Sequence, residues 1–96
     1  MQVIFTQAAR VEVIEAEDWY EARQKGLGPH FRDEVAACVL RLQENPHQFP
    51  VVLRDVHRAR LRKFPYGLFF RLEITAIVVI ACFHGSRNPK RWERRV

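Results

Sequence analysis

The first half of the chain carries apolar residues at the spacing of helix turns. Within positions 7–24 they recur at intervals of four, three and four residues, as Ala9, Val13, Ala16 and Tyr20. Residues three and four apart share one face of an α-helix, so this pattern predicts a helix whose stripe faces a core. Thr6 can cap its start with a hydroxyl, and Gly26 is expected to end it. Glu12 lies off the stripe and is expected on the surface.

A second helix is predicted from Pro29 to about Glu44. Its apolar stripe is Phe31, Val35, Cys38 and Leu42. Pro29 is tolerated in a first helical turn, and Asn45-Pro46 stops the helix because the residue before proline avoids helical dihedrals. The two helices are therefore expected to form an antiparallel hairpin. Phe49, in the loop at positions 45–50, is expected to close the edge of the core.

The second half of the chain alternates as strands do. After a short β-prone run at positions 2–5, a three-stranded antiparallel meander is predicted from Val56 to His84. Pro65 and Gly67 suit the second and fourth positions of a tight turn, and a second turn is placed at positions 74–76 by elimination. Positions 77–83 are apolar on both alternations, which predicts a strand covered on both faces. The expected fold is α+β: one domain over positions 1–96, in the order βααβββ, a two-layer sandwich with the helical hairpin on one face of an antiparallel sheet.

Charge is divided unevenly between the halves. Positions 1–50 hold five Lys and Arg against eight Asp and Glu, a balance of −3, whereas positions 51–96 hold eleven against three, a balance of +8. In a strand, Arg58, Arg60 and Arg62 would share one face, while Ala59 and Leu61 take the other. A basic half of this kind attracts phosphate backbones or an acidic protein partner, the alternative being a solvated basic surface.

The remaining chemistry is sparse. Cys38 and Cys82 are expected to be buried free thiols. The four histidines show no ligand spacing with one another or with the cysteines, so neither a metal site nor a cofactor is expected. The longest apolar run, at positions 76–83, is far shorter than the roughly 20 residues of a membrane-spanning helix. The start of the chain does not resemble a secretory signal, so a cytoplasmic protein without a membrane partner is expected.

Several short motifs occur in a particular order along nearly the whole chain. They are Trp19-Tyr20, Gly26-Leu27-Gly28 with Phe31, an NPxxFP loop at 45–50, Arg58-x-x-Leu61-x-x-Phe64-Pro65-Tyr66, and His84-x-x-Arg87-x-Pro89-x-x-Trp92. Together they resemble the RelE/ParE toxins of type II toxin–antitoxin systems, and are closer to ParE and the plasmid stabilisation proteins. The resemblance implies a small basic bacterial toxin that forms a hetero-oligomer with a cognate antitoxin, whose acidic or amphipathic segment neutralises it.

The resemblance leaves the target open between two classes. RelE-like members cut mRNA on the ribosome, which requires a proton-transfer group and cations around the reacting phosphate. For that activity His84, Arg62 and Arg71 would be catalytic, with Arg60 and Lys63 as further cations. ParE-like members poison DNA gyrase, which requires only a binding surface. For that activity the candidate target-binding residues are Arg58, Arg60, Arg87, Arg91 and Trp92. The ParE-like activity is favoured, and a relic that only binds its antitoxin is a third possibility.

Overall fold

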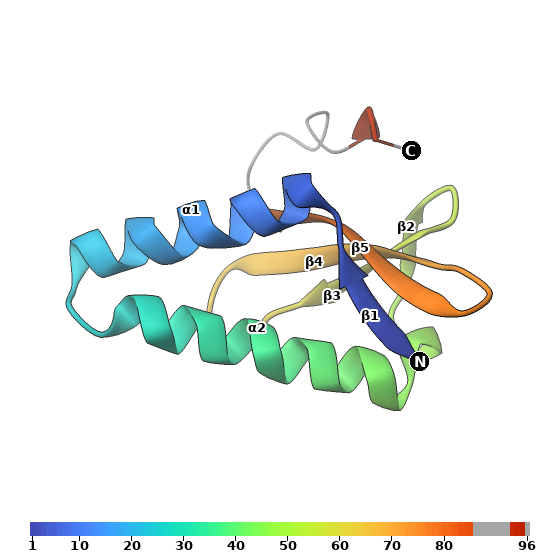
Figure 1. Ribbon diagram of the computed structural model, residues 1–96, viewed down its shortest axis with the longest axis horizontal. Helices are drawn as coiled ribbons and strands as arrows, with labels where there is room; N and C mark the ends of the chain where they lie inside the picture. The colour runs from blue at the N-terminus through green and yellow to red at the C-terminus, as the bar shows by residue number, and fades with distance from the viewer. Residues whose placement is uncertain (86–92, 96) are drawn as a thin grey trace.

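Two helices and five strands build the part of the chain that the computed structural model describes, residues 1–85 and 93–95. The elements are β1 (Gln2–Phe5), α1 (Gln7–Arg23), α2 (Leu27–Glu44), the short 3₁₀ turn η1 (Pro46–Gln48), β2 (Val51–Leu53), β3 (Val56–Arg60), β4 (Tyr66–Leu72) and β5 (Ala76–His84). Figure 1 shows the two helices side by side in one layer, on the same face of the sheet. The predicted α+β two-layer sandwich is thus confirmed.

The sheet has the strand order β1-β5-β4-β3-β2. Strands β3, β4 and β5 form the predicted antiparallel meander. Two features were not predicted. Strand β2 adds an edge to the meander, with Val51 opposite His57. Strand β1 pairs with β5 in parallel, from Gln2 opposite Ala76 to Phe5 opposite Val79, so the sheet is mixed rather than purely antiparallel.

The start of α1 follows the sequence prediction. Its first residue is Gln7, and the Thr6 hydroxyl oxygen accepts a hydrogen bond from the Ala9 amide at 3.2 Å. Asn45 follows α2, as the Asn45-Pro46 pair predicted. Neither helix in the described residues is both long and apolar enough to cross a bilayer.

The connection between the helices is tighter than predicted. Helix α2 starts at Leu27, two residues before the predicted Pro29. The preceding Gly26 has φ of 96°, a left-handed conformation that glycine adopts without a Cβ clash. The carboxylate of Glu21 accepts hydrogen bonds from the amides of Gly26, at 3.0 Å, and Gly28, at 2.8 Å. It thereby satisfies donors that a helix start leaves without partners, which lets the helix begin earlier.

The main core lies between the helices and the sheet, and it uses both predicted stripes. Ala9, Ala16, Phe31, Val35, Cys38 and Leu42 are all buried, and Phe49 packs against this cluster as expected. A second cluster, made of Val56, Phe69, Ile80, Ala81 and Phe83, lies on the other face of the sheet. A β-bulge in β5 opposite the Phe69/Phe70 pair shifts the alternation, and β5 contributes to both clusters. The prediction that this strand is covered on both faces is confirmed.

The turn between β3 and β4 differs from the predicted tight turn. Gly67 does not lie in the turn but in β4, opposite Arg60. A Cβ atom at Gly67 would lie 3.3 Å from Cγ of Arg58 and 3.4 Å from the Ala59 carbonyl oxygen. The glycine therefore allows the stem of Arg58 to lie close against β4, so its role is close packing rather than turn geometry.

Candidate functional site

His84 is the last residue of β5, opposite Tyr66 at the start of β4. The two rings contact each other edge to face, with centroids 5.4 Å apart. Tyr66 also packs against the helix-side core, so this pair lies on the face of the sheet that carries the helices. The imidazole therefore packs against the Tyr66 ring on the helix side of the sheet.

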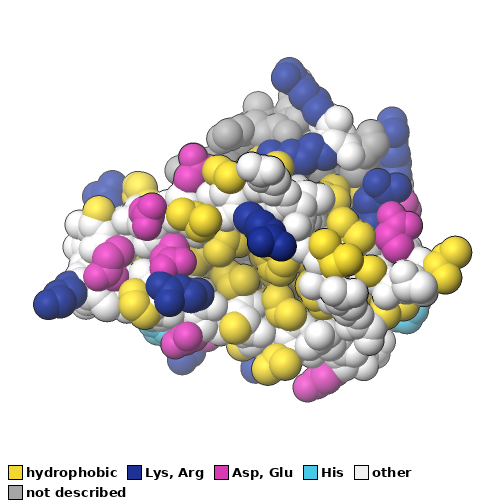
Figure 2. Space-filling model, in the orientation of Figure 1, with side chains coloured by type: hydrophobic (Ala, Val, Ile, Leu, Met, Phe, Trp, Pro, Cys, Tyr) yellow, Lys and Arg dark blue, Asp and Glu magenta, His cyan; other side chains and the backbone are white. Residues whose placement is uncertain are grey.

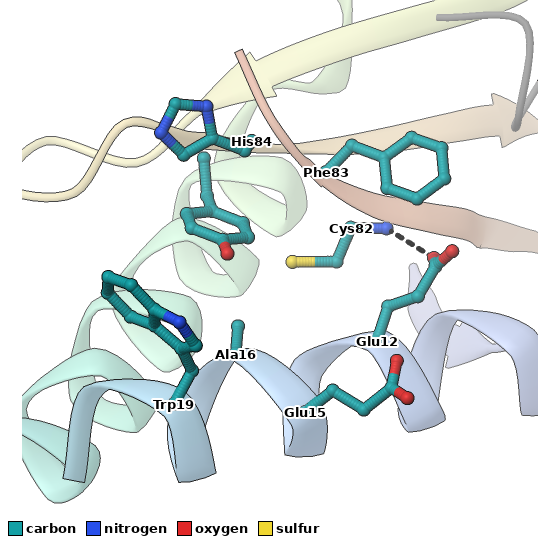
Figure 3. A pocket seen from close by; sticks show the side chains of 8 residues that line it. Glu12, Glu15, Ala16, Trp19, Cys82, Phe83 and His84 are labelled. Atoms are coloured by element: carbon teal, nitrogen blue, oxygen red, sulfur yellow. Dashed lines mark hydrogen bonds between the residues drawn. The ribbon is translucent and has the colours of Figure 1, made fainter. Parts of the chain in front are cut away.

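A pocket of about 290 Å³ opens between α1 and the end of β5. We call it the α1–β5 pocket; its lining residues are Glu12, Glu15, Ala16, Trp19, Tyr66, Cys82, Phe83 and His84. Figure 3 shows that the two carboxylates and the indole come from successive turns of α1, while β5 supplies the opposite wall with His84. The imidazole thus lies among aromatic and acidic side chains.

Glu12 has a structural role that the sequence prediction missed. Its Oε1 atom accepts a hydrogen bond from the Cys82 amide at 3.0 Å, and its two oxygens bind the Arg95 guanidinium at 3.0 and 2.7 Å. Arg95 also donates to the Ile80 carbonyl oxygen at 2.8 Å. Strand β1 pairs with β5 only as far as Val79, so Glu12 and Arg95 satisfy the backbone groups that β1 leaves open.

The expected surface position of Glu12 is therefore wrong, because its side chain is only 11% exposed. The only feature of the sequence that indicates this buried position of Glu12 is that it directly precedes Val13, at the border of the apolar stripe. A carboxylate at such a border can reach the neighbouring strand. Sequence alone does not reveal which backbone amide it meets.

The arginines of β3 take the face of the sheet opposite the helices. Arg58 lies opposite Phe69 of the second cluster, and Arg60 has the same alternation. The partners Ala59 and Leu61 are buried on the helix side, as expected. Arg62 is exposed in the loop after β3 and so lies outside the strand that carries the other two arginines.

Further cations surround the end of β3. Arg41 of α2 donates to the Arg60 carbonyl oxygen at 3.0 Å, and the Lys63 amide donates to the Glu34 carboxylate at 3.2 Å. Arg41 and Arg58 each bury an Nε atom that has no hydrogen-bond partner within the described residues. Positive charge therefore gathers at the β3 side of the sheet.

The candidate catalytic residues do not come together in one place. Arg71 lies opposite Val78 and forms an ion pair with Asp55 at 3.2 Å. It is five residues along β4 from Tyr66, the partner of His84, which corresponds to about 17 Å. Arg71 is two residues from Phe69 in β4, so its side chain lies on the face of the sheet that the helices do not cover. Arg62 follows β3, on the other side of β4 from His84.

Three candidate target-binding residues, Arg87, Arg91 and Trp92, lie outside the described residues. The two cysteines are buried and free, as expected. Burial raises the pKa of Cys38 to about 11 and that of Cys82 to about 12, so both thiols are protonated and unreactive near neutral pH. Within residues 1–85 and 93–95, no three His, Cys, Asp or Glu side chains cluster in a way that could hold a metal ion.

Known structures share this fold. The chain superposes on a chromosomal ParDE system from P. aeruginosa with a TM-score of 0.78 and 18% identity, covering 88% of this chain and 95% of that one. For the E. coli RelBE complex the TM-score is 0.64 at 18% identity, with coverages of 90% and 98%. For the isolated E. coli RelE toxin it is 0.63 at 17% identity, with coverages of 98% and 94%. At these identities the likeness concerns the fold alone.

The sequence itself decides the family. None of the curated proteins compared with it matches. Residues 3–89, however, match the family model described as the ParE toxin of the type II toxin–antitoxin system, parDE. This range runs from the second residue of β1 to beyond the end of β5 and includes both helices, so the match covers nearly all of the described sandwich. The chain therefore belongs to the ParE toxin family of type II toxin–antitoxin systems.

Proposed function

We propose that this chain is a cytoplasmic toxin that inhibits DNA gyrase by binding it, and that a cognate antitoxin neutralises it. The observation that carries the proposal is the separation of His84 from the cations of the sheet. His84 faces α1 in the α1–β5 pocket, whereas Arg58 and Arg60 lie on the opposite face of the sheet. A binding toxin does not need these groups to meet.

A ribonuclease would need a different arrangement. In-line attack by a 2′-hydroxyl requires a base and an acid within hydrogen-bond reach of the reacting atoms, and cations on the same phosphate. Among the described residues, the charged side chains that line the pocket with His84 are Glu12 and Glu15, and a carboxylate repels a phosphate. Arg71 lies at the far end of β4 and pairs with Asp55. This geometry supports binding over cleavage.

The proposed gyrase-binding surface is the cationic side of β3 together with the C-terminal segment. Arg60 is exposed at the end of β3, and Arg58 is half-buried beside it. Arg87, Arg91 and Trp92 complete the candidate set. Interface energy concentrates in arginine and tryptophan, because both combine a large contact area with directed polar contacts.

The test uses purified gyrase and relaxed plasmid, with supercoiling followed on gels. The parent chain and His84→Gln are expected to inhibit equally. Arg60→Glu is expected to weaken inhibition about ten-fold or more, since loss of an interface arginine commonly costs that much. Lys25→Glu, in the exposed turn between the helices, changes charge equally and serves as the control.

Two outcomes would overturn the gyrase proposal. One is unaffected supercoiling with the toxin in stoichiometric excess over gyrase. The other is cleavage of ribosome-bound mRNA that disappears in His84→Gln, since loss of a proton-transfer group typically slows catalysis about 10²- to 10⁴-fold.

The antitoxin part of the proposal rests on charge and on open sheet edges. The second half of the sequence carries a balance of +8, and β1 and β2 end the sheet. An acidic or amphipathic segment can bind such a surface by strand addition or by helix docking. We expect the product of the adjacent reading frame to bind with strong salt sensitivity, measured by calorimetry between about 0.05 and 0.5 M salt, a range over which charge screening becomes severe. Absence of binding would refute this part while leaving the gyrase assay unaffected.

A further inference from the structure

The α1–β5 pocket is acidic, in contrast to the basic character of the chain. Its charged lining residues are Glu12 and Glu15, with His84 at one wall, and no lysine or arginine is among the described lining residues. Trp19 and Tyr66 also line the pocket, as does Phe83, whose side chain belongs to the second cluster on the other face of the sheet. Carboxylates beside aromatic rings favour an organic cation, which gains an ion pair and contacts ring faces.

One arginine of the chain already uses this combination, and a second uses the ring contact alone. Arg95 forms a two-point ion pair with Glu12 and lies 5.4 Å from the centroid of the Phe83 ring. Arg23 places its guanidinium 4.3 Å from the centroid of the Trp19 ring. Glu12 and Phe83 thus hold one guanidinium, and Trp19 stacks on another.

Glu15 and Trp19 repeat the acid-and-ring arrangement one turn further along α1. Four positions apart on a helix, they are neighbours on its surface. Glu15 is exposed and has no hydrogen-bond or ion-pair partner in the described part of the chain, while Trp19 is 47% exposed despite its size. Figure 3 shows the Trp19 indole rising from α1 toward the wall that carries His84, with Glu15 on the preceding turn of the helix.

We propose that the α1–β5 pocket is a binding site for an arginine side chain presented by a protein partner. The guanidinium pairs with Glu15 and stacks against Trp19, while the aliphatic stem contacts the ring of Tyr66. Glu12 keeps its bonds to Cys82 and Arg95, so Glu15 supplies the unpaired charge of the site. Arginine fits better than lysine because its flat guanidinium both stacks and forms two-point ion pairs. The site does not depend on gyrase being the target.

The test is an NMR titration of the full chain with N-acetyl-L-arginine amide. N-acetyl-L-citrulline amide is the probe of equal shape without charge. The arginine probe is expected to cause saturable shifts of the Trp19 indole N–H and of the Ala16, Cys82 and His84 amides. The citrulline probe is expected to bind at least about five-fold more weakly, because it loses both the ion pair and the cation–π contact.

Variants separate the pocket from general charge attraction. Glu15→Gln removes the charge without touching the Glu12–Arg95 pair, and should weaken the arginine probe by about three- to five-fold. Trp19→Leu should weaken it about ten-fold, and Trp19→Phe less, since the ring remains. Asp18→Asn, exposed on the same helix but outside the pocket lining, should bind like the parent.

Three results would overturn the proposal: equal binding of the arginine and citrulline probes, equal weakening by Glu15→Gln and Asp18→Asn, or shifts that map away from the pocket. Thermal unfolding of each variant shows whether the fold is intact. Because Glu15 is exposed, Glu15→Gln should leave the unfolding temperature nearly unchanged, whereas Trp19→Leu should lower it modestly through the lost ring contact with Tyr20.

Discussion

Replacing Glu12 by alanine should destabilise the fold strongly, although the residue lies on the solvent side of its helix in the sequence pattern. The change removes the acceptor of the Cys82 amide and the partner of Arg95. A hydrogen bond to a charged group is worth about 1.5–3 kcal/mol, and a buried amide without a partner adds its desolvation cost. The Arg95 side chain is 29% exposed, so water offsets part of its loss.

The expected loss in the free energy of unfolding is about 2–3 kcal/mol. For a domain of this size, it corresponds to a fall of roughly 10–20 °C in the unfolding temperature. Glu12→Gln keeps an oxygen acceptor for the Cys82 amide and loses only the charge, so it should cost about 1 kcal/mol. The measurement is urea denaturation followed by circular dichroism, with the slope m compared among variants.

Glu15→Ala is the matched control, one turn along α1 and exposed, and should change stability by less than about 0.5 kcal/mol. A double-mutant cycle with Arg95→Gln should show a coupling of about 1 kcal/mol between Glu12 and Arg95. If Glu12→Ala and Glu15→Ala unfolded at the same urea concentration with equal m, the role assigned to Glu12 at the edge of β5 would be wrong.

Three further outcomes are expected. Ala16→Asp should prevent folding, since it buries an unpaired carboxylate at a site only 4% exposed, whereas Ile14→Asp, on a site 56% exposed, should fold normally by circular dichroism. Glu21→Ala should cost about 1–2 kcal/mol in urea denaturation, because it leaves the first amides of α2 without an acceptor; an unchanged midpoint would contradict this. The free energy of unfolding should also fall above about pH 9, by about 1.4 kcal/mol per pH unit for each buried thiol. Burial raises the pKa of Cys38 to about 11 and that of Cys82 to about 12, so these thiols lose their protons at lower pH in the unfolded chain than in the folded one. A double cysteine-to-alanine variant should have the flatter profile, and identical profiles would count against this assignment.

Local order in this protein is fixed by contacts between residues close in sequence. The stripes of α1 and α2, the Thr6 cap and the Asn45-Pro46 stop all depend on neighbours within a few positions, so the sequence determined both helices and their phases. The alternation after Val56 similarly determined three strands and the arginine face of β3. The ordered motifs, which run from Trp19 to Trp92, indicated the family.

Other features depend on residues that are distant along the chain, and only the tertiary structure decided them. Glu12 meets Cys82 across 70 positions, and β1 pairs with β5 in parallel at the opposite end of the sequence. Gly67 lies in β4 opposite Arg60, and only the tertiary structure shows that a Cβ there would crowd the stem of Arg58. No local pattern specifies these long-range contacts. They follow from the strand order and from how the helices pack on the sheet, both of which are set by the burial of a shared core.

The candidate site shows the same division. Sequence singled out His84 and the arginines by residue type, but residue type carries no information about which side of the sheet each one takes relative to another. The β-bulge in β5 shifts the alternation partway along the strand, so that Ile80 and Ala81 both join the second cluster while Cys82 and His84 return to the helix side. An irregularity of one residue thus decides that His84 faces α1 and its two carboxylates, because each step along a strand reverses the side on which a side chain lies.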